Sequence, residues 1–116
     1  MLRFANILSL ILLSLTPLAA QSTFGEIRGL VRDASGASVG NATVTATRPN
    51  TGESRKVTSD ESGGYVLANL QAGEWDVQIE KTGFRPAVSR GIALRAREVA
   101  RVDLALELGQ VTTEVQ

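Results

Sequence analysis

The residue types that usually perform catalysis are scarce in this sequence. Its 116 residues include no His and no Cys. Zinc peptidase sites usually include His, and Ser–His or Cys–His nucleophile pairs require it. A calcium loop needs oxygen ligands at alternate positions, and Asp60, Ser62 and Gly64 offer only one carboxylate. We therefore predict a solvated turn at Asp60, no enzyme activity, no cofactor, and no catalytic, cofactor-binding or metal-binding residue.

Basic residues gather late in the chain and could contact an anionic partner. The planar guanidinium group of Arg can bind a phosphate or carboxylate group through two hydrogen bonds. Arg95, Arg97 and Arg101 are therefore candidate contact residues. Acidic residues on a predicted strand, Glu74 and Asp76 among them, could pair with this group and leave a mixed charged surface. Lys and Arg total 12 and Asp and Glu total 12, which argues against a nucleic-acid partner.

Aromatic residues offer one candidate platform for a sugar ring. Tyr65, Trp75 and Phe84 fall in phase with the predicted core, so we expect them inside. Phe24 stands near the start of the predicted domain and could be exposed. A glycan is therefore an alternative partner, and Phe24 is the residue expected to contact it.

The first twenty residues have the layout of a secretory signal peptide. Arg3 supplies positive charge, residues 7–15 form an apolar run, and Ala20 ends a segment of small residues. The run has about half of the ~20 residues that a membrane span needs, so we predict no transmembrane span after cleavage. We expect a signal-peptide helix at 1–20, cleaved after Ala20, and a short linker at 21–23. An uncleaved N-terminal anchor is the alternative.

From residue 24 onward, apolar and polar residues alternate with period two, which predicts strands with one buried and one wet face. Ala42, Val44 and Ala46, for example, alternate with threonines. Turn signals separate the runs at short intervals, and we assign turn roles to Gly36, Gly64, Gly73 and Gly83. Gly29, inside a strand, predicts a bulge or a close backbone approach. The predicted strands are 24–33, 42–48, 54–59, 64–70, 74–81, 87–94 and 99–108.

This spacing favours an all-β fold, a seven-stranded antiparallel β-sandwich over residues 24–108, followed by a strand-like tail at 109–116. The inward phase of each strand defines the expected core, and we expect Phe84 to close one end of it. The principal predicted core residues are Ile27, Val31, Val44, Tyr65, Leu67, Leu70, Trp75, Val77, Ile79, Phe84, Val102 and Leu104.

Five groups of residues carry a recognisable order and spacing: 27–36, 40–44, 58–60 with 64–65, 69–77 and 81–84. Together they resemble the carboxypeptidase regulatory-like domain. Gly40 stands where that family often has Pro, and Trp75 stands where Tyr is common. The resemblance implies a transthyretin-like (prealbumin-like) sandwich, found beside peptidase domains and at the N-terminus of TonB-dependent outer-membrane receptors, directly after the signal peptide.

We therefore expect an exported, non-catalytic interaction module in the periplasm or at the outer membrane, or secreted. Its expected partner is a protein of the cell envelope. An open sandwich leaves edge strands that can accept another strand, and the tail with Val111 is a candidate to supply or accept such pairing. A carbohydrate-binding module is the competing class.

Overall fold

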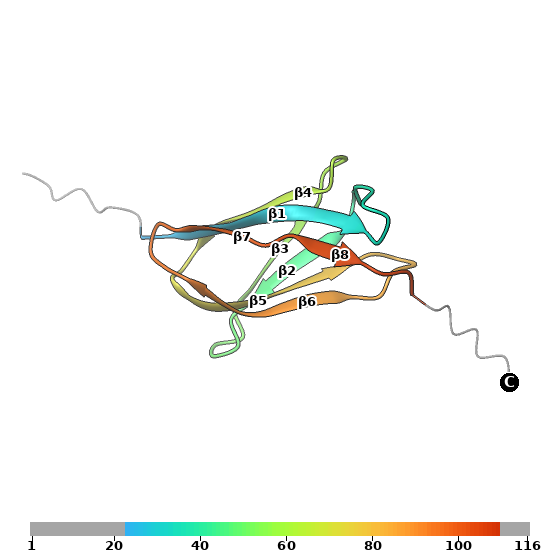
Figure 1. Cartoon of the computed structure of the whole chain (residues 1–116). Coiled ribbons are helices and arrows are strands. Elements are labelled where there is room, and N and C mark those ends of the chain that lie inside the picture. The colour runs from blue at the N-terminus through green and yellow to red at the C-terminus, as the bar shows by residue number, and fades with distance from the viewer. Residues whose placement is uncertain (1–22, 110–116) are drawn as a thin grey trace, which may run out of the picture.

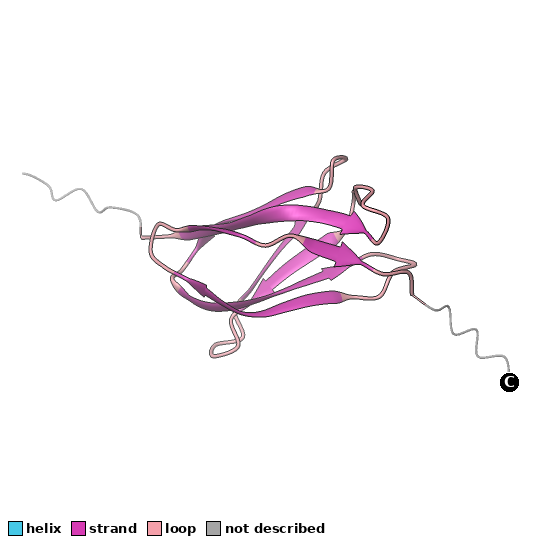
Figure 2. Cartoon of the chain, in the orientation of Figure 1, coloured by secondary structure: helices cyan, strands magenta, loops and turns pink. Residues whose placement is uncertain are grey.

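The computed structural model describes residues 23–109, and every regular element in that range is a strand (Figure 2). Alternating apolar and polar residues form strands because successive strand side chains point to opposite faces. The strands are β1 (Gly25–Asp33), β2 (Thr43–Thr47), β3 (Ser54–Thr58), β4 (Gly64–Leu70), β5 (Gly73–Glu80), β6 (Ala87–Leu94), β7 (Val99–Arg101) and β8 (Leu104–Leu106).

The strands form two packed layers (Figure 1). One sheet has the order β4-β1-β7, with β8 also pairing with β1, and the other has the order β3-β2-β5-β6. The described part of the chain begins and ends at opposite ends of the sandwich (Figure 1). The predicted all-β sandwich is confirmed.

The last predicted strand, 99–108, differs from expectation. It is divided into β7 and β8, so the described residues form eight strands instead of seven. Both pieces run parallel to β1, with Ile27 opposite Ala100 and Val31 opposite Leu104, so the first sheet is mixed and not purely antiparallel. The alternation predicts that these residues are extended, but it carries no information on strand direction.

A close backbone approach explains the break between β7 and β8. A Cβ atom on Gly29 would lie 1.8 Å from the Val102 carbonyl oxygen, so only glycine fits there. That oxygen accepts a hydrogen bond from the Tyr65 hydroxyl, and the Val102 N–H donates to the Arg28 carbonyl at 2.8 Å. The next residue, Asp103, accepts from the Leu30 N–H at 2.8 Å. The close approach predicted at Gly29 is present.

The core lies between the two sheets. Trp75 is fully buried, its indole N–H donates to the Gln71 carbonyl at 2.9 Å, and the Arg48 guanidinium lies 5.7 Å from the ring centroid. Ser59, a buried polar residue, bridges Val39 and Ala42 through its hydroxyl. The buried apolar residues are Ile27, Val31, Val39, Ala42, Val44, Ala46, Tyr65, Leu67, Leu70, Trp75, Val77, Ile79, Leu94 and Leu106.

Three residues predicted for the core interior lie at its margin instead. Phe84, Val102 and Leu104 are only partly buried and pack against the core from outside. Phe84 lies in the connection between β5 and β6, and Val102 lies in the break between β7 and β8. Leu104 belongs to the short outer strand β8, where no further strand covers it within its sheet.

Three of the four predicted turn glycines have a positive φ. Gly36, Gly73 and Gly83 have positive φ angles of 89°, 145° and 90°. Gly64 begins β4 and closes the turn through hydrogen bonds to Asp60, but the positive φ of this turn, 82°, belongs to Gly63. A sequence of two adjacent glycines cannot show which one the turn uses.

Several predictions fall outside the described residues. These are the signal peptide at 1–20, most of the linker at 21–23, and the tail from residue 110 with Val111. Over the range that the structure covers, no helix is long and apolar enough to cross a membrane.

Replacing Gly29 with Ala tests the close approach. The new methyl group would meet backbone atoms, so we expect Gly29→Ala to lower the free energy of unfolding by about 3 kcal/mol in urea denaturation. Gly36→Ala is the control, because a Cβ there meets nothing within 4 Å and only the positive φ costs stability, roughly 1 kcal/mol. Equal losses in the two variants would contradict the proposed packing.

Candidate functional site

The loop at residues 60–64 is a turn closed by one carboxylate. Asp60 Oδ1 accepts hydrogen bonds from the Ser62 N–H at 3.0 Å, the Ser62 hydroxyl at 2.8 Å and the Gly64 N–H at 2.8 Å. The same pattern recurs at residues 33–37, where Asp33 Oδ1 accepts from the N–H groups two and four residues later. We call these two loops the twin Asp turns.

Hydrogen bonding to the charged form lowers the pKa of both carboxyl groups. The Ser62 hydroxyl and then the Gly64 N–H lower the pKa of Asp60, and Ser35 and Ala37 act likewise on Asp33. Residues 23–109 contain no group of three or more acidic side chains that could hold a metal ion. The carboxylates of the twin Asp turns therefore serve the loops that connect the strands.

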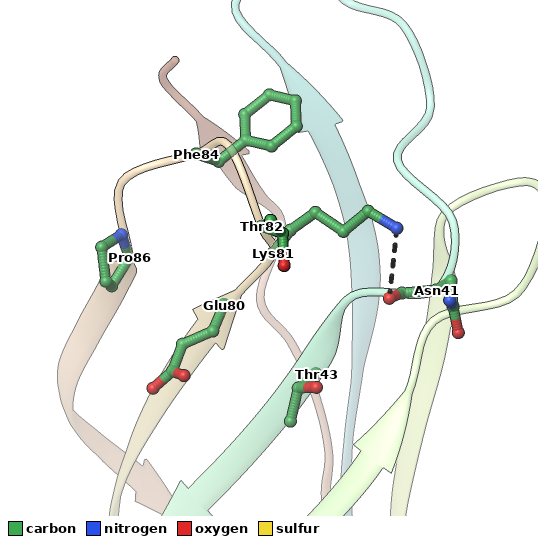
Figure 3. Close-up of a pocket in the computed structure, with 7 residues that line it drawn as sticks. All are labelled: Asn41, Thr43, Glu80, Lys81, Thr82, Phe84 and Pro86. Atoms are coloured by element: carbon green, nitrogen blue, oxygen red, sulfur yellow. Dashed lines mark hydrogen bonds between the residues drawn. The ribbon is translucent and has the colours of Figure 1, made fainter. Parts of the chain in front are cut away.

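A shallow pocket of about 430 Å³ lies at the β2 and β5 end of the second sheet (Figure 3). Thr43 on β2 is paired with Glu80 on β5, so a hydroxyl and a carboxylate lie side by side on the outer face. Lys81 Nζ donates to the Asn41 carbonyl at 3.4 Å. The pocket is lined by Asn41, Thr43, Glu80, Lys81, Thr82, Phe84 and Pro86.

This pocket could hydrogen-bond a small polar ligand but offers no pair of facing carboxylates for acid–base chemistry. No local pattern in the sequence indicates it. Thr43 and Glu80 each belong to the wet face of a predicted strand, and only the pairing of β2 with β5 places them together.

A second groove, of about 490 Å³, runs over the first sheet and the β3–β4 side of the sandwich. Its two arginines are engaged nearby, because Arg28 pairs with Glu26 and Arg101 pairs with Asp103 at 3.0 Å. Burial, and then the negative charge of Asp103, raise the pKa of Tyr65 to about 12. Its hydroxyl therefore remains a hydrogen-bond donor to Val102 at neutral pH. The groove is lined by Arg28, Gly29, Leu30, Val57, Thr58, Asp60, Gly64, Tyr65, Val66 and Arg101.

The predicted contact residues do not gather at one site. Phe24 is 46% exposed and precedes β1, where the Glu26 N–H donates to the Glu98 carbonyl of the β6–β7 connection. Arg95 and Arg97 are exposed in that same connection, so these three residues share the end of the sandwich where the described chain begins.

Arg101 lies apart from that end, on the outer face of the first sheet, opposite Arg28 in the register. The remaining late basic residues are spread further, and Arg90 on β6 forms an ion pair with Asp76 at 3.8 Å. The late arginines thus form a mixed charged surface and not a single anion site.

The comparison with known families decides what kind of domain this is. The sequence pattern of the carboxypeptidase regulatory-like domain matches residues 26–107. The chain belongs to this family. It is also 34% identical over 97 residues to the TonB-dependent transporter Oar of Myxococcus xanthus, a match that covers 80% of this chain and 9% of that protein. The chain thus corresponds to a small part of the transporter's length.

Solved structures share the fold at low sequence identity. Catechol 1,2-dioxygenase from Pseudomonas arvilla matches with a TM-score of 0.61 and 13% identity, over 83% of this chain and 56% of that chain. A candidate carbohydrate-binding protein from Bacteroides uniformis matches with a TM-score of 0.59 and 17% identity, over 74% of this chain and 42% of that chain. These likenesses establish the sandwich and do not transfer an activity.

The pKa shifts predict how the twin Asp turns respond to pH. A carboxyl pKa lowered in the folded state stabilises the fold above the unfolded pKa, about 3.9, and this contribution is lost as pH falls through the folded value. We expect Asp60→Ala to lower the melting temperature at pH 7, with a smaller difference from wild type below pH 3. Asp60→Asn retains the acceptor oxygen and should lose less stability.

Glu61→Ala is the matched control, because Glu61 is exposed in the same loop and accepts no hydrogen bond that closes the turn. Melting curves followed by circular dichroism across pH measure the effect. An Asp60→Ala variant as stable as Glu61→Ala at pH 7 would show that the carboxylate does not hold the turn.

Proposed function

We propose that this chain is an exported, non-catalytic interaction module of the cell envelope that binds protein, in the manner of an N-terminal extension of a TonB-dependent transporter. The observation that carries the proposal is the 34% identity to the transporter Oar over most of the chain. The predicted signal peptide supports export, since it directly precedes the matched domain.

Two features of the residues support a role without catalysis. The full sequence has no His or Cys, so the common His- and Cys-dependent nucleophile pairs are unavailable. The four described groups with shifted pKa values have structural partners. Asp33 and Asp60 close turns, Tyr65 donates to the Val102 carbonyl, and Asp103 accepts from the Leu30 N–H and from Arg101. Such partners account for the shifts without an active site.

Protein contact would involve the end of the sandwich that carries Phe24, Arg95 and Arg97, together with Arg101 on the first sheet. Exposed aromatic and Arg residues are the types enriched at binding hot spots. The tail with Val111 is the second candidate surface, because Val111 and Val115 would share one face of an extended segment that could add a strand to a partner's sheet.

A glycan-binding module is the second candidate function, favoured by the pocket of Figure 3. Its hydroxyl, carboxylate and ammonium groups lie beside the apolar surfaces of Phe84 and Pro86, a combination suited to a sugar ring. A structural neighbour described as a candidate carbohydrate-binding protein adds support at the level of the fold alone.

Capture of envelope proteins tests the first proposal. The full chain is produced in an exporting bacterium, where we expect the purified product to begin at Gln21. This protein should retain specific partners from an envelope extract, and Val111→Lys should weaken that retention by placing a charge on the apolar face of the tail. Thr112→Lys, which puts the same charge on the opposite face, is the control. An identical set of retained proteins for wild type and Val111→Lys would count against the tail.

A glycan array tests the second candidate. If the pocket of Figure 3 binds sugar, Thr43→Ala and Glu80→Gln should each abolish the signal, whereas Thr47→Ala on the same strand should leave it unchanged. If the ring of Phe24 is the platform instead, Phe24→Ala alone should abolish binding. An empty array, or a signal that survives every one of these changes, would remove the glycan hypothesis.

A further inference from the structure

The edge strands of the described sandwich differ in how well they are protected against pairing. Edge strands are commonly protected by charges, bulges or short length. β3 carries Arg55 and Lys56, and Arg55 lies opposite buried Ala46, so a charge stands on its inward face. β6 contains Gly91 with a φ of 70°, and its register with β5 shifts between Trp75 and Val77.

The edge of the first sheet formed by β7 and β8 is protected because both strands are short. β7 and β8 have three residues each and are separated by the break at Val102 and Asp103. A partner strand could not form a continuous ladder along such an edge.

β4 carries a bulge at its C-terminal end, where Asn69 has a φ of 57° and the register with β1 shifts between Leu67 and Leu70, but the rest of the strand is regular. It has seven residues, no charged side chain and no proline, and it pairs with β1 alone. Its register with β1 is regular from Gly64 to Leu67, and Val66 is 48% exposed on the outer face. Among the described strands, β4 is therefore the edge best suited to accept another strand.

The hydrogen-bond phase shows which backbone groups of β4 are available. The Val31 N–H donates to the Gly63 carbonyl at 2.8 Å, whereas Leu30 bonds to Asp103 on the other side of β1. Since the direction alternates along a strand, the residues of β4 opposite Gly29 and Ile27 point their backbone groups at β1. These residues are Tyr65 and Leu67. The backbone groups of Val66 consequently point outward. We extend this alternation to Ala68, because Ala68 is exposed like Val66 and the unusual φ of the bulge belongs to Asn69, the next residue.

The backbone N–H and carbonyl of Gly64 also point away from β1, but both already form hydrogen bonds within the turn. Its N–H donates to Asp60 Oδ1 at 2.8 Å, and its carbonyl accepts from the Asp60 N–H at 2.9 Å. The groups left for a new strand are those of Val66 and Ala68, placed symmetrically about Leu67.

We infer that β4 pairs antiparallel with β4 of a second copy, about a two-fold axis at Leu67. Val66 of each copy lies opposite Ala68 of the other, and these two pairs exchange four backbone hydrogen bonds. The contact is self-complementary, as a two-fold interface must be. Self-pairing at β3 would bring its cations close together, whereas β4 brings no like charges face to face.

The inference goes beyond the proposed function, since neither an envelope partner nor a glycan takes part. One strand pair buries less surface than the ~1,200 Å² typical of stable complexes, so we expect a weak, concentration-dependent dimer. Dimerisation and partner capture are measured separately, and either proposal can fail without the other.

Sedimentation equilibrium of the purified full chain from roughly 10 µM to 1 mM tests the inference. We expect the average mass to rise toward that of a dimer. Val66→Lys should weaken association at least tenfold by bringing like charges near the axis. Ala68→Pro should do the same by removing an outward N–H, a change that an edge strand tolerates. Circular dichroism checks that each variant is folded.

Val88→Lys is the matched control, because Val88 is 41% exposed on β6 of the other sheet, and it should dimerise like wild type. Wild-type protein that stays monomeric throughout the range would overturn the inference, even if it captures another protein. So would a folded Val66→Lys variant that still dimerises.

Cross-linking tests the register, and the absence of native Cys makes it specific. The double variant Val66→Cys, Ala68→Cys should form intermolecular disulfides, since opposed residues have Cα atoms about 5.5 Å apart. Val66→Cys alone should cross-link poorly, because two copies of residue 66 are diagonal neighbours, roughly 7–8 Å apart. Equal cross-linking of the two proteins would contradict a two-fold axis at Leu67.

Discussion

The contact on which this sandwich depends is the approach of the Val102 carbonyl to the backbone of Gly29. No side chain other than hydrogen fits at position 29, and the Tyr65 hydroxyl fixes the same carbonyl from the neighbouring strand. Two strands and one connection thus meet at one oxygen atom: β1 through Gly29, β4 through Tyr65, and the β7–β8 connection through Val102. Since β1 is central in its sheet, this point joins the N-terminal and C-terminal parts of the described chain.

That contact also determines which edges the molecule presents. Because the chain leaves the β7 ladder at Val102 and resumes pairing only at Leu104, the β7–β8 side is short and interrupted. The opposite side of the same sheet is β4, which is longer and uncharged. The described residues therefore present one longer, uncharged backbone edge on this sheet, together with a separate end surface around Phe24 and a polar pocket on the second sheet.

Much of the fold could be predicted because local alternation decides it. The buried faces of Val44 and Ala46, or of Trp75, Val77 and Ile79, follow directly from period two. Pairing is different, since the parallel alignment of Val31 with Leu104 joins residues 73 positions apart and leaves no local signal. The margin position of Phe84 and the use of Gly63 instead of Gly64 depend on how connections close, which local patterns do not specify.

The candidate surfaces were harder to predict than the core for the same reason. Burial leaves a pattern in sequence, whereas the meeting of Thr43 with Glu80, or of Arg28 with Arg101, depends on which strands are neighbours. Hydrogen exchange followed by NMR tests the central contact most directly. We predict that the Leu30 and Val102 amides exchange only by global unfolding in wild type, and that Tyr65→Phe lets them exchange by local opening while the β2 amides stay protected. Rapid exchange of these two amides in wild type, or unchanged protection in Tyr65→Phe, would contradict the account.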